Sequence, residues 1–282
     1  MSSPSTRRRI MAITSSPSYR KAFEDIGFLK SEGLRPVRLQ LELLKPDVML
    51  EKQGVKATVV VFGSARITER AHAQRQLQRL EQDFGKRPKN RALALRLAAA
   101  RALVRKAKYY DESRRFAALI SRHYKGKGVT IVTGGGPGIM EAANRGADDV
   151  GAKSMGLNIT LPFEQDPNPF ITPELCFQFH YFAVRKMHFL LRAKALVVFP
   201  GGYGTMDELF EALTLIQTGK MPRFPVILVG RQYWAKAVNF RYLVEEGVVA
   251  PKDEHLFHVV ETAQEAFAIV KRSFRIAKSS NK

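Results

Sequence analysis

Short runs of apolar and β-branched residues alternate with helical patterns from residue 57 onward. The runs lie at 57–66, 128–133, 153–162, 195–199 and 224–230, and each closes near glycine or proline. Nearly unbroken apolar runs are typical of parallel strands that are buried on both faces. We therefore expect an α/β fold, a Rossmann-like doubly wound parallel sheet with helices on both faces. In such a fold, ligands bind outside the carboxyl ends of the strands.

Helical spacing of apolar residues marks two further regions of the chain. Residues 19–53 predict one or two short helices with a break at Pro46, because proline removes a backbone donor from a helix interior. Residues 69–123 predict two helices, interrupted at 84–90 by FGKRPKN. The first dozen or so residues predict a frayed start. We expect an N-terminal extension over 1–56, partly disordered and then helical, followed by the sheet domain over 57–282.

Composition narrows the class of protein. The 282 residues are 45% hydrophobic, which suffices for the core of one large domain or two small ones. The single cysteine, Cys176, excludes an internal disulfide framework, and no Cys and His cluster at ligand spacing suggests a metal site. No apolar run approaches the ~20 residues of a membrane span, and the start lacks a secretory pattern. These features predict a cytoplasmic protein without a membrane partner.

The positive charge lies in the first half of the chain. Residues 1–130 carry 29 Lys and Arg against 11 Asp and Glu, a net charge of +18, whereas residues 131–282 contribute +2 to the total of +20. Such a charge suits binding to a phosphate backbone. The basic residues are, however, spread through Ala- and Leu-rich helical sequence with no recognisable nucleic-acid module. We favour a solvated or oligomer-facing surface over a nucleic-acid site, which stays open.

Two glycine-rich turns, GGGPG (134–138) and PGGYGT (200–205), each follow a predicted strand and open a predicted helix. Glycines let the backbone approach a ligand, and N–H groups at a helix start attract an anion such as phosphate. The first turn makes Gly135 and Gly136 candidate ligand-binding residues. Neither turn is a dinucleotide fingerprint, since Ile139 stands where G-x-G-x-x-G needs glycine, and no Walker A sequence occurs. An NAD-dependent dehydrogenase is therefore disfavoured.

The second turn carries additional chemistry. Thr205 offers a hydroxyl at the helix start, and Asp207 and Glu208 place carboxylates close behind it, which the helix dipole also stabilises without a ligand. Upstream, Arg185 and Lys186 form a basic pair that could clamp a phosphate or lie on a helix surface. An arginine and a carboxylate in one pocket could stabilise charge and transfer protons in the cleavage of a glycosidic bond.

The combination of GGGPGIMEAA, VRK and PGGYGTMDE resembles the LONELY GUY (LOG) family, formerly labelled lysine decarboxylase. Its hallmark PGGxGTxxE is complete from Pro200 to Glu208, and Arg185 precedes Glu208 by 23 residues, which is the family's spacing. The resemblance runs from about residue 58 to 260. Residues 71 to about 107 look like a helical insertion and 1–56 like an extra N-terminal piece, which suggests a larger, bacterial-type branch.

The resemblance implies a phosphoribohydrolase, which hydrolyses the N-glycosidic bond of AMP or of a cytokinin riboside 5′-monophosphate to free base and ribose 5-phosphate. It makes Glu208 the catalytic carboxylate and Arg185 its partner. Thr214 matches a family threonine that contacts ligand, Glu164 is a looser match, and Ser64 lies where the family has a serine-rich turn. The remaining candidates for binding substrate or phosphate are Lys186, Gly201, Gly202, Tyr203, Gly204, Thr205 and Asp207.

The implied mechanism passes through an oxocarbenium-like ribosyl cation. Glu208 would stabilise this cation and activate water, while Arg185 would position the nucleotide or assist the departing base. We expect both groups to be charged at neutral pH, so that no metal and no other cofactor is required.

Several alternatives stay open. The chain could be a broad purine or pyrimidine nucleotide nucleosidase for salvage, or a non-catalytic nucleotide sensor, although the presence of both Glu208 and Arg185 weighs against a sensor. No sequence feature supports a pyridoxal-phosphate decarboxylase. The expected partners are a nucleoside monophosphate and further copies of the chain, because family members are commonly dimers and larger branches form higher oligomers.

Overall fold

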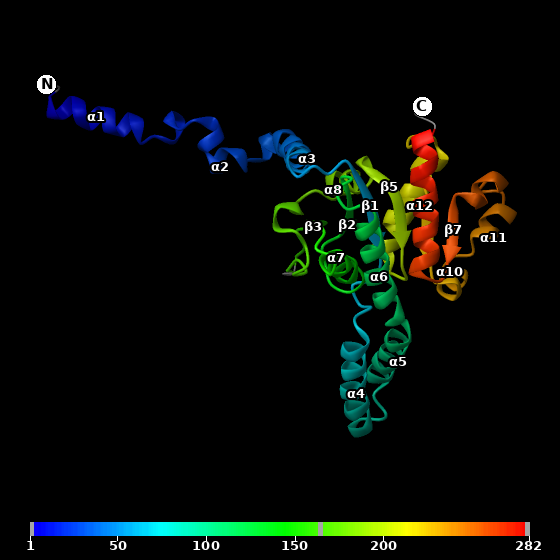
Figure 1. Ribbon diagram of the computed structural model, residues 1–282. Coiled ribbons are helices and arrows are strands. Elements are labelled where there is room, and N and C mark those ends of the chain that lie inside the picture. Colours follow the sequence, from blue (N-terminus) through cyan, green and yellow to red (C-terminus); the bar gives the residue numbers. More distant parts are fainter. Residues whose placement is uncertain (1–2, 163–165, 280–282) are drawn as a thin grey trace. The chain divides into compact units, whose positions relative to one another are not determined.

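The computed structural model describes residues 3–162 and 166–279. It divides the chain into two compact units, Met1–Asp47 and Val48–Lys282, and the second unit contains the whole sheet (Figure 1). The division between an extension at 1–56 and a domain at 57–282 stays a prediction.

Seven parallel strands form a sheet in the second unit, in the order β4-β3-β2-β1-β5-β6-β7. Val59, Val60 and Val61 are fully buried, as expected for a central parallel strand covered on both faces. The strands are β1 (Ala57–Phe62), β2 (Val129–Thr133), β3 (Ser154–Ile159), β4 (Cys176–Phe179), β5 (Ala193–Val198), β6 (Val226–Val229) and β7 (Phe257–Val260).

The chain changes direction across the sheet at β1. It runs outward through β2, β3 and β4, then returns to the other side of β1 and continues through β5, β6 and β7. Strands β1 and β5 pair directly, with Val61 opposite Val197 and Phe62 opposite Val198. This switch point between β1 and β5 is where an open α/β sheet forms a ligand crevice.

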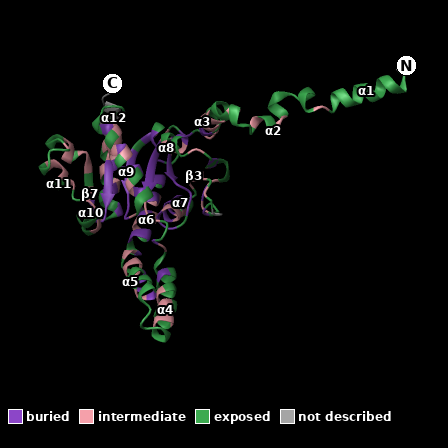
Figure 2. Cartoon of the chain, turned by 180° about the vertical axis from the view of Figure 1, so that it is seen from behind, coloured by how far each residue is buried: buried purple, intermediate pink, exposed green. Residues whose placement is uncertain are grey.

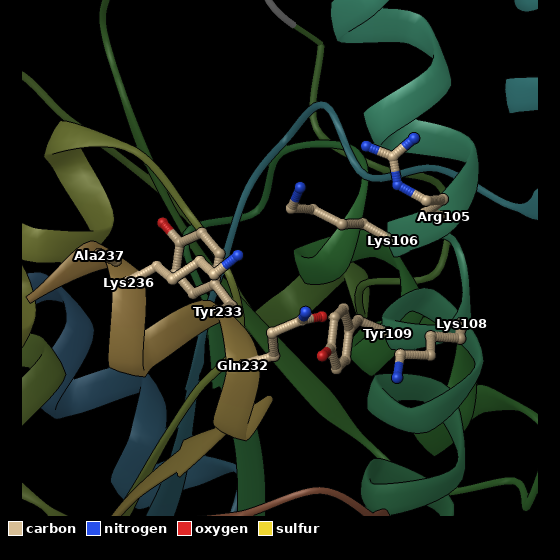
Figure 3. A pocket seen from close by; sticks show the side chains of 8 residues that line it. All are labelled: Arg105, Lys106, Lys108, Tyr109, Gln232, Tyr233, Lys236 and Ala237. Atoms are coloured by element: carbon tan, nitrogen blue, oxygen red, sulfur yellow. The ribbon is translucent and has the colours of Figure 1, made fainter.

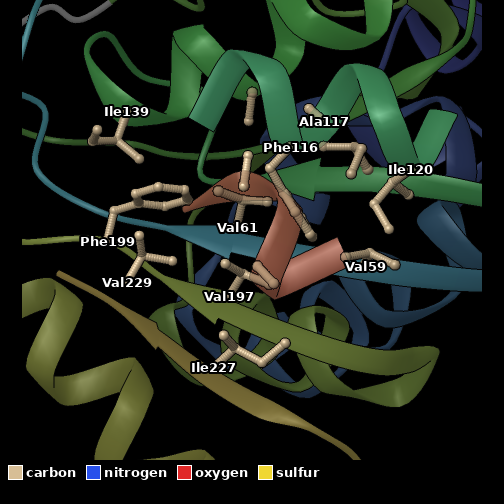
Figure 4. Packing of buried hydrophobic residues seen from close by; sticks show 14 of the residues in the cluster. Val59, Val61, Phe116, Ala117, Ile120, Ile139, Val197, Phe199, Ile227 and Val229 are labelled. Atoms are coloured by element: carbon tan, nitrogen blue, oxygen red, sulfur yellow. The ribbon is translucent and has the colours of Figure 1, made fainter. Parts of the chain in front are cut away.

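Helices cover both faces of the sheet. On one face, Phe116 and Ile120 of α6 (Lys108–His123) pack against Val59 and Val197 in a fully buried cluster, which α7 (Ile139–Asp148) and α12 (Ala263–Ser279) extend (Figure 4). On the other face, the ring of Phe62 lies 4.7 Å from that of Phe189. The predicted doubly wound α/β fold is confirmed, and Figure 2 shows the buried strands between exposed helical surfaces.

The helices that carry the site and its surroundings follow the strands in order. Phe189 belongs to α8 (Phe182–Leu191), which precedes β5, and α9 (Tyr203–Gln217) follows β5. Two short helices, α10 (Arg231–Ala237) and α11 (Phe240–Glu245), come between β6 and β7.

Residues 69–123 form three helices rather than the expected two. They are α4 (Arg70–Lys86), α5 (Arg91–Lys106) and α6, and only Ala107 separates the last two. The sequence offers no glycine or proline at this second boundary, which explains why the pattern did not reveal it. Helices α4 and α5 lie side by side as a hairpin, joined by an ion pair of 3.2 Å between Arg101 and Glu81 (Figure 1).

Two further differences concern strands and Pro46. Strands β4 and β7 are not predicted from the sequence because a polar residue, Gln178 in β4 and His258 in β7, interrupts each apolar run. Pro46 lies inside α3 (Arg35–Lys52), so the expected break is wrong. Proline removes a single backbone hydrogen bond, and the turns on either side keep theirs.

The first unit is helical where it is described. Helix α1 (Pro4–Thr14) is capped by Ser3, whose hydroxyl accepts a hydrogen bond of 3.2 Å from the Thr6 N–H. Helix α2 (Ile26–Leu29) is capped by Asp25, whose carboxylate accepts a hydrogen bond from the Phe28 N–H. The frayed start expected from the sequence therefore holds a capped helix over 4–14.

Candidate active site

Three turns meet at the carboxyl ends of β1, β2 and β5. Ser64, which follows β1, donates its backbone N–H to the Pro200 carbonyl at 3.0 Å and accepts the Ile139 N–H on its own carbonyl at 3.2 Å. The Ser64 hydroxyl accepts the Arg66 N–H at 3.1 Å. Ser64 thus joins the two glycine turns through its backbone.

The first glycine turn depends on glycine at residue 135. Gly135 has φ of +76°, and a β-carbon there would collide with the side-chain amide of Asn158. Its N–H donates to the Thr133 hydroxyl at 3.0 Å. The sequence thus produces a tight backbone turn directly after β2 for steric reasons.

A network of buried polar side chains holds the first glycine turn in place through hydrogen bonds. The Asn168 side-chain amide donates to the carbonyls of Gly135 and Gly136, each at 3.1 Å, and to Asn144 Oδ1 at 3.0 Å. Thr133 donates its hydroxyl to the same Asn144 oxygen at 2.7 Å. Because the Gly135 and Gly136 carbonyls are used here, these two glycines shape the turn. Sequence reasoning missed Asn144 and Asn168, since nothing local marks an asparagine as a partner of a distant turn.

The second glycine turn leads into the N-terminus of α9. Gly202 is the N-cap residue and supplies no side-chain acceptor, so the first N–H groups of the helix lack intrahelical partners. These N–H groups belong to the predicted phosphate-binding stretch Gly201–Thr205. The Thr205 side chain is buried against Gly201, whereas the Tyr203 side chain is 97% exposed. Tyr203 can contribute its backbone to a phosphate site in this chain, but its ring points to solvent.

Tyr233 fixes the second turn from α10. Its hydroxyl donates a hydrogen bond to the Gly201 carbonyl. Burial raises the pKa of Tyr233, although its bond to the Gly201 backbone acts in the opposite direction, so the phenol stays a donor. No local signal in the sequence predicts this role, because a tyrosine 32 residues away from Gly201 is expected to be a packing residue.

Glu208 is a buried carboxyl group one turn into α9, with 7% of its surface exposed. Burial raises its pKa to about 7, and the charges of Glu211 and Asp207 act in the same direction, while Lys186 and Arg185 counteract them. The expectation of a fully charged Glu208 at neutral pH is therefore wrong: burial in a low-dielectric site keeps part of it protonated. A carboxyl group with a pKa near the working pH is suited to proton transfer.

Arg185 reaches from α8 toward the first glycine turn. Its Nε donates to the Leu157 carbonyl on β3 at 2.8 Å, and its guanidinium lies 5.0 Å above the Phe189 ring. The turn passes so close that a β-carbon on Gly134 would lie 2.8 Å from Arg185 Nη2. Burial lowers the pKa of Arg185 and the charge of Glu208 raises it, but a guanidinium remains charged at neutral pH.

Lys186 pairs with two carboxylates on α9 instead of standing free. Its amine lies 2.9 Å from Asp207 Oδ1 and 3.1 Å from Glu211 Oε2. Burial alone would lower the pKa of Lys186, yet the hydrogen bonds to Asp207 and Glu211 outweigh it and raise the pKa. Two predicted ligand-binding residues, Lys186 and Asp207, therefore bind each other, and Glu211 completes the cluster.

One predicted site residue, Thr214, is not brought to Glu208. The Thr214 hydroxyl donates to the Phe210 carbonyl within α9 at 2.7 Å, and its side chain lines a separate, mainly apolar cavity of about 170 Å³ beside Phe240. Six residues of helix place it roughly 9 Å further along the axis than Glu208. Glu164 lies outside the described residues.

The described residues contain no metal centre and no membrane-spanning helix. Within 3–162 and 166–279, no three His, Cys, Asp or Glu side chains gather in a way that could hold a metal ion. None of the helices in these ranges is long and apolar enough to cross a membrane.

Comparisons with known proteins extend the resemblance seen in the motifs. A family model described as "Possible lysine decarboxylase" matches residues 140–270. Among solved structures, the molybdenum cofactor carrier protein of Chlamydomonas reinhardtii covers 78% of this chain and 99% of its own, at 19% identity and a TM-score of 0.47.

Two plant proteins with known family membership show the family to which this chain belongs. A probable cytokinin riboside 5′-monophosphate phosphoribohydrolase of Arabidopsis thaliana is 31% identical over 145 residues, which are 49% of this chain and 70% of the plant protein. A second, from Oryza sativa subsp. japonica, is 27% identical over 158 residues, 52% of this chain and 70% of its own. Both are LOG proteins, and with the hallmark from Pro200 to Glu208 in place at the start of α9, this chain belongs to the LONELY GUY family.

Proposed function

We propose that this protein is a nucleoside 5′-monophosphate phosphoribohydrolase that releases free base and ribose 5-phosphate. The observation that carries the proposal is Glu208, a buried carboxyl group with a pKa raised to about 7, beside the charge of Arg185 and one turn into a helix that opens on a glycine turn. The activity printed for the relatives, on cytokinin riboside 5′-monophosphates, supports the same reaction class.

The phosphate is proposed to bind at the N-terminus of α9. The free N–H groups after Gly202 and the positive end of the helix dipole suit a phosphate dianion. Lys186 contributes indirectly, since its two ion pairs hold Asp207 and Glu211 on the same helix. In this proposal Lys186 positions α9 and does not contact the phosphate.

The reaction replaces the bond between C1′ and the base with a bond between C1′ and a water oxygen. The electron pair of the broken bond leaves with the base, and the ribosyl carbon gains oxocarbenium character. The Glu208 carboxylate stabilises this charge and accepts a proton from the attacking water. The departing base takes up a proton from solvent, and Glu208 returns the water proton to solvent, so that the step balances. Arg185 orients the nucleotide beside the first glycine turn.

The test is product analysis on a panel of substrates. We expect the purified protein to release base from AMP or a cytokinin riboside monophosphate but not from the corresponding nucleosides, because these lack the phosphate that α9 binds. Glu208→Gln should abolish release, whereas Glu245→Gln, a surface carboxylate on α11 paired with Arg241, should retain it.

The same panel separates the remaining alternatives. Comparable rates with GMP, CMP and UMP would replace the narrow substrate class with a salvage nucleosidase. Nucleotide binding without any release would instead identify a sensor and contradict the proposed activity.

We also propose that the protein works as a homo-oligomer. Helices α8 and α9 leave large apolar side chains in solvent beside the site, a pattern typical of an interface. Light scattering of the purified protein should report a dimer or larger, and Met187→Glu should dissociate it; a monomer would contradict the proposal. The exposed side chains are Phe182, Met187, Leu191, Tyr203 and Phe210.

A further inference from the structure

A basic cavity separate from Glu208 lies between the α5–α6 junction and α10. It has a volume of about 550 Å³, and its walls face each other across the gap in Figure 3, with Lys106 and Tyr109 on one side and Tyr233 and Lys236 on the other. We propose that this cavity binds a second ligand of the protein, a small molecule that carries a diphosphate group. The inference does not depend on hydrolysis at Glu208, and its test uses AMP only to block the phosphate site proposed at α9.

The charge of the cavity walls points to a polyanion. Of the described side chains that line it, four are cationic (Arg105, Lys106, Lys108 and Lys236) and none is acidic. Lys108 is neutralised by an ion pair of 2.8 Å with Glu261. Across the described ranges, the other three form no ion pair, which leaves a charge of +3 around one cavity. A diphosphate group carries about this much negative charge near neutral pH, whereas a carboxylate or a sulfate leaves the excess unmatched.

The walls are held in place by contacts outside the cavity. Tyr109 is 4% exposed, its hydroxyl donates to Glu261 Oε1 at 3.2 Å, and a β-carbon on Gly230 would lie 2.7 Å from that hydroxyl. The α5–α6 junction is therefore fixed against the start of α10. The cavity is a preformed feature of the second unit, as ligand sites usually are.

One residue, Tyr233, connects the cavity to the second glycine turn. Tyr233 lines the cavity with its ring and donates its hydroxyl to the Gly201 carbonyl. A ligand that contacts Tyr233 therefore contacts a residue that positions the N-terminus of α9. We expect occupancy of the cavity to change the apparent affinity of the α9 turn for phosphate monoesters, in either direction, through this hydrogen bond.

The experiment measures binding of inorganic pyrophosphate and of ADP by calorimetry. Glu208→Gln protein saturated with AMP is used, so that AMP occupies the α9 turn and is not consumed. We expect both probes to bind, and the double variant Lys106→Gln/Lys236→Gln to weaken each by about tenfold or more, because two charge-assisted contacts are lost. The matched control, Lys220→Gln/Lys252→Gln, removes two exposed charges outside the cavity and should change binding less than about twofold.

Three results would overturn the proposal. They are no binding of either probe, equal weakening in both double variants, and binding of a single-stranded oligonucleotide in place of pyrophosphate through the same lysines, which would make the cavity part of a nucleic-acid surface. Because no turnover is measured, failure here leaves the proposed hydrolysis untouched. Loss of hydrolysis, in turn, leaves pyrophosphate binding unaffected.

Discussion

The Lys186 amine lies 2.9 Å from the Asp207 carboxylate and thereby joins α8 to α9 next to the buried Glu208. It also binds Glu211 at 3.1 Å, so a single ammonium group holds two carboxylates that would otherwise repel Glu208. The charge of Lys186 lowers the pKa of Glu208 against the effect of burial. This pair therefore tunes the group that we place at the reacting carbon.

Lys186→Met should move the pH dependence of hydrolysis to higher pH. Loss of the positive charge removes an effect that lowers the pKa of Glu208, so the carboxyl group should titrate above its value of about 7. Activity at pH 7 should fall and recover toward pH 9, as seen in a profile of kcat/KM against pH. An unchanged profile with a uniformly lower rate would mean that Lys186 acts on the phosphate directly.

Glu208→Gln should stabilise the protein at alkaline pH. The folded pKa of about 7 exceeds the ordinary value of 4.5, so the folded state binds the proton more tightly than the unfolded state and loses stability as pH rises through this window. The ionised carboxylate then costs about 3 kcal/mol above pH 7. Urea unfolding should find the variant equal to the wild type near pH 4.5 and more stable at pH 8. Equal stability at both pH values would contradict the raised pKa.

Arg185→Lys should lose activity although it keeps the positive charge. Lysine cannot donate to the Leu157 carbonyl in the geometry of Arg185 Nε or lie flat above the Phe189 ring. We expect kcat/KM to fall by about 10²-fold, the usual effect of a misplaced charge-stabilising group. Arg231→Lys, on the exposed surface of α10, is the control and should remain active; a fully active Arg185→Lys enzyme would show that charge alone suffices.

Asn168→Ala should destabilise the first glycine turn. The substitution leaves the carbonyls of Gly135 and Gly136 and the Asn144 side chain with one hydrogen bond fewer each, in a buried position. Loss of buried hydrogen bonds of this kind costs about 1–3 kcal/mol in the free energy of unfolding. Asn239→Ala, which removes an exposed cap of α11, should cost about 1 kcal/mol in the same urea titration. A similar loss in both variants would show that the buried network contributes little.

Most of the sheet could be predicted because its strands are unbroken apolar runs. The centre of the sheet, from β3 to β6, follows from these runs and from the turns that close them. Edge strands such as β7 and the α5–α6 boundary at Ala107 lack a pattern of their own and are decided by packing. At Pro46 the local sequence is misleading in the opposite way: proline predicts a helix break, yet α3 continues through it.

The sequence by itself determined the doubly wound fold, the two glycine turns, and the motif that joins Arg185 to Glu208, because each rests on residues close together in the chain or on a fixed spacing. Only the tertiary structure decided the protonation of Glu208, the pairing of Lys186 with Asp207, and the cavity that Tyr233 shares with the α5–α6 junction. These properties depend on burial and on distances between residues that are far apart in the chain. No local pattern encodes them, since the electrostatic energy of a group is set by everything that folds around it.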